Sequence, residues 1–432
     1  EFLHDRVQQA AYSLLREAEK KAAHVKIGRL ILQFTTEDLI EENVFIVMDH
    51  LNRGLDLITD QEERSRLAGY NLLAGRKAKA ATAYDAALNY FKCGTELLPA
   101  NAWADSYQLA FDLYLERAFC EYLCDRHDVA RQLLATLLDK VKTDLERADI
   151  CVAKILLYAS RERYHETLEQ GSEGLQMLGV NLPAEPGKID LLQELLRVRW
   201  LLYKHEPGAL APPAAALEPS IRRVMRLLLT QAVAACMVKP ALFALIILKM
   251  SRFSFEQGDS ELSPLGCACY SYFAGSVLQD RETSRVFAQI ALRQVEQFEY
   301  SSTIRCAVYF VLGALVSHWT APAGRGIAYL QKAVTYGLES GNLLIVSYAL
   351  NLSIENKYLS GTPLDELHRE CGRYHKLATS VRIGYYQALI EELRDPSSGE
   401  RVAAAGGKRS YGGPAETSPV GGEMPLLGGK DK

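Results

Sequence analysis

Apolar residues recur every three or four positions along most of the 432-residue chain, and short stretches rich in Gly, Pro, Asn and Asp separate the periodic segments. This spacing places the apolar side chains on one face of an α-helix. Runs that alternate apolar and polar residues, as half-buried strands do, are nearly absent. Residues 27–32 resemble a short strand, but they continue the helical spacing of Ala18, Ala22 and Val25. The pattern therefore predicts an all-α protein.

A longer period is superimposed on the helical one. A small residue is followed four positions later by a residue that fits a groove between helices, and three positions after that by a small residue or leucine. The six copies are Ala87, Phe91 and Gly94; Ala130, Leu134 and Leu137; Thr167, Gly171 and Gly174; Ala244, Leu248 and Ser251; Ser284, Ala288 and Ala291; and Gly326, Leu330 and Ala333. Successive copies are offset by 43, 37, 77, 40 and 42 residues. The long offset is close to two units and contains a Pro-rich insertion between Pro183 and Pro219.

The repeated pattern has a physical reason. Two helices approach closely only where their facing side chains are small, and a bulky residue between small ones fills the neighbouring groove. We predict that each copy lies on the second helix of an antiparallel pair, and that the pairs stack into a solenoid with a concave inner wall. Chance is the alternative, because alanine is abundant and the pattern is loose. The regular offset argues against chance, as do the helix breakers Pro99, Gly179 and Gly341.

The first unit has the layout of a tetratricopeptide repeat. Gly75 lies twelve residues before Ala87, the aromatic Phe91 follows, and Pro99 lies twelve residues after Ala87. Because the usual repeat has about 34 residues, the helices or turns here are expected to be longer than in the consensus. That extra length keeps a HEAT-like array as the lesser alternative.

The composition fits a folded protein, with 48% hydrophobic and 24% charged residues. A net charge of −4 offers nucleic acid or an anionic membrane no overall attraction, so we expect no nucleic-acid partner. The most apolar stretch, Leu227–Leu248, is split by Lys239 and Pro240, and neither half reaches the roughly 20 residues of a membrane span. Two buried helices that meet at a turn are predicted instead.

The nine cysteines show no spacing typical of zinc ligands or of a redox pair. Free cysteine commonly packs as a small apolar residue. We therefore interpret these residues as buried thiols in a reducing compartment, and we expect a cytoplasmic protein.

No pattern nominates a catalytic, cofactor-binding or metal-binding residue, and no cofactor is expected. The sequence has no phosphate-binding loop and no kinase motif. The nearest Gly-containing segments are 75–77, expected inside a helix, and 324–326, expected in a turn between helices. Ser317 and His318 are adjacent, so they face different directions on a helix and do not form a nucleophile pair. Gly54 is predicted to cap the helix that ends near residue 51.

Tyrosine is frequent, with 22 residues. Aromatic side chains are common anchors at binding surfaces. Those that could line a groove for a peptide or helix are Tyr270, Tyr272, Tyr385 and Tyr386. Packing between helices is the more ordinary alternative for each of them.

The opening of the chain has a distinctive sequence, and several later segments contribute to the same resemblance. The segments are Phe2–Tyr12, His24, Ile27–Leu30, Val47–Gly54, Leu72–Ala78, Val316–Trp319 and Gly337–Gly341. Together they resemble the region that follows the AAA-type ATPase module in large multi-sensor signalling kinases. Those proteins join a Ser/Thr-kinase-like domain, an ATPase module, a tetratricopeptide-like region, GAF sensors and a histidine kinase. The resemblance covers roughly residues 1–393, and its opening motif is more specific than the repeats.

The resemblance implies that the first stretch ends a winged-helix element that closes the ATPase module. The helices after it would relay signals between nucleotide state, sensors and kinase. Five parts are therefore expected: residues 1–58, the end of the winged-helix or ATPase-associated element; 59–182, a first tetratricopeptide-like array; 183–219, a Pro-rich insertion with one helix; 220–394, a second array; and 395–432, a disordered Gly/Pro-rich tail. No catalytic residue of that family matches a position in this chain.

We therefore expect a non-catalytic scaffold or regulatory segment of a signal-transduction ATPase or sensor kinase. Its partners would be adjacent ATPase, sensor or kinase domains, or a peptide or helix in the concave groove. The alternative is the inducer-sensing solenoid arm of an ATPase-type transcription regulator, which would bind a small molecule. An enzyme built on an α-solenoid is a third hypothesis, and no residue constellation supports it.

Overall fold

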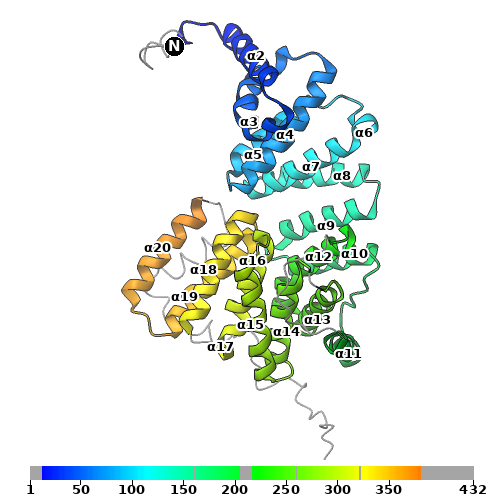
Figure 1. The fold of residues 1–432 in the computed structure, drawn as a ribbon, viewed down its shortest axis with the longest axis vertical. Coiled ribbons are helices and arrows are strands. Elements are labelled where there is room, and N and C mark those ends of the chain that lie inside the picture. The colour runs from blue at the N-terminus through cyan, green and yellow to red at the C-terminus, as the bar shows by residue number, and fades with distance from the viewer. Residues whose placement is uncertain (1–11, 160, 205–216, 259, 321–322, 381–432) are drawn as a thin grey trace, which may run out of the picture.

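The computed structural model describes residues 12–159, 161–204, 217–258, 260–320 and 323–380. These residues form helices and turns, and no β-strand occurs among them. The all-α prediction is therefore confirmed. Figure 1 shows helical hairpins that follow a curved path from α2 to α20. Most of the opening motif and the whole predicted tail at 395–432 lie outside the described residues.

Helix pairs make up most of the described chain. It begins with α2 (Glu17–Phe34), α3 (Glu37–Leu51) and the short 3₁₀ helix η1 (Asn52–Leu57). The pairs up to the middle are α4 (Gln61–Ala80) with α5 (Tyr84–Leu97), α7 (Tyr107–Leu123) with α8 (His127–Lys140), and α9 (Asp144–Ala159) with α10 (Tyr164–Met177). The short α6 (Ala102–Asp105) precedes α7, and α11 (Lys188–Lys204) follows α10.

The second half continues in the same way. Its first pairs are α12 (Pro219–Val238) with α13 (Pro240–Glu256), and α14 (Ser263–Ser276) with α15 (Arg281–Gln297). Then α16 (Ser302–Phe310), the π-helical η2 (Val311–Val316) and α17 (Ser317–Thr320) form one continuous rod that pairs with α18 (Ala323–Ser340). The last pair is α19 (Leu343–Leu359) with α20 (Leu364–Ser380).

The six copies of the small-residue pattern lie on α5, α8, α10, α13, α15 and α18. Each of these is the second helix of a pair, as predicted. Phe91 is fully buried, and a Cβ added to Gly75 of α4 would lie only 2.3 Å from its ring. A Cβ added to Gly171 of α10 would lie 2.3 Å from the side chain of Gln231 on α12. Small residues thus set the close approach of helices both within a pair and between pairs.

The predicted helix breaks are also found. Gly179 and Gly341 follow α10 and α18 with φ angles of 74° and 71°, in the left-handed region that favours glycine. Pro219 and Pro240 are the first residues of α12 and α13, where the missing N–H of proline costs no helical hydrogen bond. The apolar stretch is therefore split as expected. No described helix combines the length and hydrophobicity needed to cross a bilayer.

Two predictions about glycine were wrong. Gly54 does not cap α3, because it lies within η1 and its φ of −135° is outside the left-handed region. A Cβ there would lie 2.5 Å from Val25, so Gly54 lets η1 pack against α2. Residues 324–326 belong to the first turn of α18 and not to an inter-helix turn. Gly326 is buried, and a Cβ there would lie 2.4 Å from the hydroxyl of Ser317.

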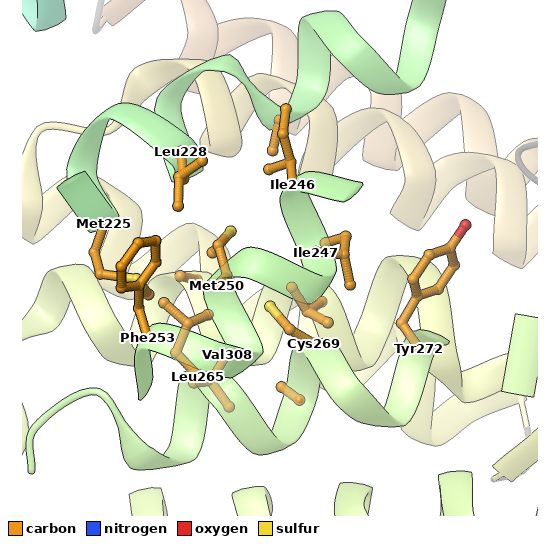
Figure 2. Close-up of a cluster of buried hydrophobic side chains, with 14 of the residues drawn as sticks. Met225, Leu228, Ile246, Ile247, Met250, Phe253, Leu265, Cys269, Tyr272 and Val308 are labelled. Carbon is orange, nitrogen blue, oxygen red and sulfur yellow. The ribbon is translucent and has the colours of Figure 1, made fainter. Parts of the chain in front are cut away.

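The buried apolar side chains form two large clusters. One runs from α9 to α19, and Figure 2 shows part of it, where Met225 of α12, Met250 and Phe253 of α13 and Cys269 of α14 come together. The other covers α2 to α7 and includes side chains of α19 such as Val346. Residues from the last described pair therefore complete the core of the first pairs.

The curved array closes on itself. The hydroxyl of Tyr84, at the start of α5, donates a hydrogen bond to the carbonyl of Leu338 near the end of α18 at 3.1 Å. The hydroxyls of Tyr164 on α10 and Tyr348 on α19 lie 3.3 Å apart. In Figure 1 the ends of α18 and α20 lie below α5. The path thus curves back, and its later pairs contact its earlier ones.

All nine cysteines are free thiols, and seven of them are buried. Burial raises the pKa of Cys267 and of Cys306 to about 12. These thiols stay protonated near neutral pH, and a thiol is a far weaker nucleophile than a thiolate. The cysteines of the core therefore act as small apolar side chains, as predicted.

Three of the turns inside helix pairs share a conformation that the sequence does not reveal. Thr82, Asp125 and Glu162 each have a positive φ, between 56° and 61°, at the junctions α4–α5, α7–α8 and α9–α10. At each turn the next residue donates its N–H to a carbonyl five positions back, for example Ala83 to Ala78 at 2.9 Å. This is the hydrogen bond of a Schellman motif, in which glycine is the usual residue.

Replacing Thr82 by glycine is expected to raise the free energy of unfolding by about 0.5–1 kcal/mol. The left-handed conformation costs an L-residue about 1–2 kcal/mol, and the extra freedom of glycine in the unfolded chain offsets part of the gain. Chemical denaturation followed by circular dichroism measures the change. Thr82→Ala is the control, since alanine retains the Cβ and should change stability by less than about 0.5 kcal/mol. An unchanged or lower stability for Thr82→Gly would contradict this account.

Candidate functional site

The structure places two of the four tyrosines singled out in the sequence in the core. Tyr270 and Tyr272 are only 4% and 8% exposed. The ring of Tyr270 packs edge-on against Phe287 with centroids 4.7 Å apart, and Tyr272 packs against Phe243 at 5.5 Å. Both therefore serve inter-helix packing and do not line an open groove. Tyr385 and Tyr386 lie outside the described residues.

The segment 317–319 is likewise structural. The Ser317 hydroxyl donates to the carbonyl of Gly313 at 2.8 Å, and the indole N–H of Trp319 donates to the Ser284 hydroxyl at 2.9 Å. Burial lowers the pKa of His318 below its ordinary value, which favours the neutral ring. Each of the two hydrogen bonds fixes a helix contact, and neither activates a nucleophile.

The histidines near the start of the chain do meet. His24 of α2 and His50 of α3 approach at 2.8 Å between their Nδ1 atoms, and the other ring nitrogen of His24 lies 2.9 Å from the Tyr12 hydroxyl. The pKa of His24 is lowered by burial, by Arg53 and by His50. The pair ties α2 to α3. In the described part of the chain, no group of three His, Cys, Asp or Glu side chains is arranged to hold a metal ion.

A ladder of charged side chains crosses the first helices of successive pairs, a surface that we call the inner wall. Arg76 of α4 pairs with Asp112 and Glu116 of α7, at 3.2 and 3.1 Å. Arg223 of α12 pairs with Asp149 of α9 at 2.8 Å. Burial raises the pKa of Asp149 above its ordinary value even though Arg223 opposes the shift. Solenoid proteins bind partners through their concave surfaces.

Arg226 of α12 is an exposed cation of the inner wall, as Arg76 is. Its guanidinium lies 5.3 Å above the ring of Phe119 on α7, and Lys79 of α4 lies 5.7 Å from the same ring. Among the described residues, no carboxylate forms an ion pair with Arg226, although Asp149 and Glu116 act on its charge. Enclosure by protein lowers the pKa of Arg226, but a guanidinium remains charged near neutral pH. It can therefore bind a carboxylate brought by a ligand.

An apolar cavity lies next to Arg226 along α12. Its accessible volume is about 50 Å³, and part of it is open to solvent. The lining comes from α12, α13, α14, α16, η2 and α19: Leu229, Ala232, Val233, Cys236, Phe243, Ile247, Met250, Cys269, Phe310, Val311, Ala314, Leu315, Ile345, Tyr348 and Leu352. Leu229, Val233 and Cys236 follow Arg226 at helical spacing. The same face of α12 therefore carries Arg226 and, further along the helix, three side chains that line the cavity.

The cavity wall includes the π-helical segment η2. A Cβ on Gly313 would lie 3.0 Å from the carbonyl oxygen of Gly326 on α18, so the two backbones are in close contact. Widened helical turns of this kind are frequent at functional sites. Here η2 directs Val311, Ala314 and Leu315 toward the cavity.

The N-terminal end of the array exposes a second apolar surface, which we call the N-terminal face. It consists of Ile27, Leu30 and Phe34 on α2 and Leu39 and Ile46 on α3. Phe34 is 82% exposed and Ile46 is 55% exposed.

Sequence reasoning missed both the free arginine and the cavity. Arg226 lies among other basic residues of α12, and nothing in the sequence indicates that Arg223 has an acidic partner while Arg226 has none. The cavity is lined by six elements that are distant along the chain. The signal that could have been used is the position of Arg226, one helical turn before an apolar run.

Comparison with known proteins gives one distant relative. The chain is 22% identical over 415 residues to the hybrid signal transduction histidine kinase G of Dictyostelium discoideum. The aligned region covers 86% of this chain but 12% of that protein, so the chain spans a small part of its relative. No protein-family model matches the sequence, and no solved structure is significantly similar to it. The similarity supports the expected link to histidine-kinase signalling proteins.

Proposed function

We propose that this chain is a non-catalytic, tetratricopeptide-like regulatory segment of a multidomain signalling kinase, and that it acts by binding neighbouring domains or proteins. The similarity to a hybrid histidine kinase and the paired helical array both support this function. In this proposal α2 and α3 belong to the end of an AAA-type ATPase module, within residues 1–58. The arrays at 59–182 and 220–394, separated by the insertion at 183–219, connect that module to sensor or kinase domains in the cytoplasm.

The N-terminal face is the observation that carries this proposal. Five large apolar side chains stay exposed on the first two described helices. Leaving apolar area in water costs about 25 cal/mol per Å², so exposed apolar side chains that gather in one patch usually mark a protein contact. An adjoining domain that covers α2 and α3 would bury them. The same contact would let that domain transmit a displacement into the array.

Site-specific crosslinking tests this function. A photo-reactive amino acid at position 34 is expected to capture a protein region that carries a phosphate-binding loop or a histidine-kinase domain. Position 286 on α15 is the matched control, because Val286 is also exposed, at 43%, but lies outside the N-terminal face. Equal capture at both positions would contradict the proposal. So would ATP hydrolysis or autophosphorylation by the purified chain above a heat-inactivated control.

The inner wall favours a second candidate function, the sensing of a small molecule. The cavity is apolar, and Arg226 offers a positive charge on the same face of α12. A small apolar carboxylic acid matches both features, with its chain in the cavity and its acid group on the guanidinium. This candidate corresponds to the inducer-sensing arm considered from the sequence.

A thermal-shift titration with straight-chain fatty acids of increasing length tests the second candidate. A saturable rise in melting temperature is expected, and it should weaken in Arg226→Gln and vanish in Ala314→Phe, which fills the cavity. Arg131→Gln on α8 is the control, because Arg131 is exposed and far along the chain from the cavity. The absence of a shift, or an equal shift in all four proteins, would exclude the candidate.

A further inference from the structure

Helix α11 stands apart from the paired helices. It follows α10 and packs mainly on α13, and Figure 1 shows it at the lower right of the molecule. The face toward α13 buries Glu194, Val198 and Leu201. The Glu194 carboxylate, 4% exposed, pairs there with Arg252 and with Lys249, the latter at 3.5 Å. One face of α11 is thus fixed to the array by both apolar and ionic contacts.

The opposite face of α11 is apolar and exposed. Its five large side chains are Ile189 (71% exposed), Leu192 (53%), Leu196 (58%), Trp200 (60%) and Tyr203 (92%). They follow one another at steps of three or four residues across two heptads. A stripe with this average spacing of 3.5 residues is the seam of a left-handed coiled coil. The seam is about 21 Å long at 1.5 Å per residue.

The residues beside the seam carry one sign of charge. The other exposed residues of α11 are Lys188, Gln193, Arg197, Arg199 and Lys204. The two acids of the helix are engaged elsewhere, because Glu194 is buried and Asp190 accepts the N–H of Gly187 at 2.7 Å. The exposed face therefore has four cations and no exposed carboxylate, although Arg197 also pairs with the buried Glu194 at 3.5 Å and Arg199 interacts with the hydroxyl of Tyr270 on α14. The chain as a whole has a net charge of −4, so this basic face is a local feature.

We propose that α11 is a docking site for an amphipathic helix of a partner protein, with an apolar heptad seam flanked by Glu or Asp. Charges beside a coiled-coil seam determine which helix pairs with which. A second copy of α11 would place cations against cations, which opposes self-pairing. A membrane-surface helix inserts a broad apolar face, whereas this seam is narrow and periodic. The proposal adds a partner to the function above and does not depend on the N-terminal face.

Fluorescence anisotropy with designed peptides tests the proposal on the full chain. One stapled helical peptide carries Leu and Ile along a three-heptad seam with Glu beside it, and a matched peptide carries Lys in place of Glu. The Glu peptide is expected to bind at least about tenfold more tightly than the Lys peptide. Its affinity should fall as salt is raised, because the flanking charges are exposed.

Two double variants locate the binding site. Leu192→Ser with Leu196→Ser should weaken binding of the Glu peptide at least about tenfold. These positions are exposed, and Val198 and Leu201 still hold the helix, so the circular dichroism spectrum should not change. Leu359→Ser with Leu364→Ser is the matched control at the turn between α19 and α20, where two leucines are similarly exposed, and should leave binding unchanged.

Four results would overturn the proposal. The first is equal affinity for the Glu and Lys peptides, and the second is equal loss of binding in the two double variants. The third is self-association of the chain that the α11 variant abolishes. The fourth is α11-dependent binding to phosphatidylserine vesicles without binding of the Glu peptide. The third result would assign the face to a second copy and the fourth to a membrane. None of them changes the crosslinking expected at position 34, so the two proposals fail separately.

Discussion

Replacing Phe91 by alanine is expected to lower the free energy of unfolding by about 3–5 kcal/mol, the usual cost of truncating a buried aromatic side chain. Phe91 is 0% exposed and fills the groove above Gly75. Gly75 has no side chain that could fill the space left by the ring, so the cavity stays open. Chemical denaturation followed by circular dichroism measures the loss. Phe34→Ala is the matched control, because Phe34 is 82% exposed and should change stability by less than about 0.5 kcal/mol.

The pairing of Phe91 with Gly75 makes a sharper test possible. Gly75→Val alone is expected to cost about 1–3 kcal/mol, since the added side chain overlaps the Phe91 ring. Combined with Phe91→Ala, the valine occupies the vacated space, so the double variant should lose less than the sum of the single losses. Additive losses would show that the two residues do not share one packing site.

Replacing Glu194 by alanine is expected to destabilise the chain by about 3–5 kcal/mol, because one member of a buried ion pair remains without its partner. Lys249 is 9% exposed and lies 3.5 Å from the carboxylate, while Arg252 also pairs with Glu256. Most of the destabilisation is therefore expected to come from the charge of Lys249, which is left buried without a partner. Denaturation of the variant measures it. Glu282→Ala is the control, since the Glu282–Arg285 pair is exposed and its removal should cost less than about 1 kcal/mol.

The cost of Glu194→Ala should depend on pH. Burial lowers the pKa of Lys249 below its ordinary value even with Glu194 present, and Glu194 opposes that shift. Without the Glu194 carboxylate, the pKa of Lys249 should fall further. At pH values above that lowered pKa, the lysine is neutral in the folded chain, and no unpaired charge is buried. The penalty should therefore shrink as pH rises. The double variant Glu194→Leu with Lys249→Met should recover most of the stability, because apolar residues often replace a buried pair without loss. A penalty that does not depend on pH would contradict this explanation.

The sequence was sufficient for the helical pairs because their determinants are local. The small-residue pattern, Gly179, Gly341 and Pro240 each act within a few residues of a helix end or contact, so their positions predict the break or the close approach. Gly54 shows the limit of that reasoning. A glycine near a helix end fits both a cap and a close packing contact, and only the approach of Val25 from α2 distinguishes them.

The candidate binding surfaces were largely beyond prediction because they depend on distant residues. Whether Arg226 is free depends on Arg223 taking Asp149, 74 positions earlier in the chain. The apolar residues of α11 fit an ordinary amphipathic helix, and only the packing of Glu194 against α13 shows which face remains exposed. Tyr270 and Tyr272 failed as groove residues for the same reason, since their burial depends on neighbouring helices.

The contact between Tyr84 and Leu338 gives the array a property that open repeat proteins lack. In an open stack each unit depends only on its neighbours, so units can be removed from one end with little effect at the other. Here a hydrogen bond joins residues 254 positions apart, and α19 contributes to the core of the first pairs. The first and the last described pairs are therefore expected to unfold together. A ligand or domain that displaces α19 would therefore alter the packing around α5 directly. The change would not have to pass through each intervening helix in turn.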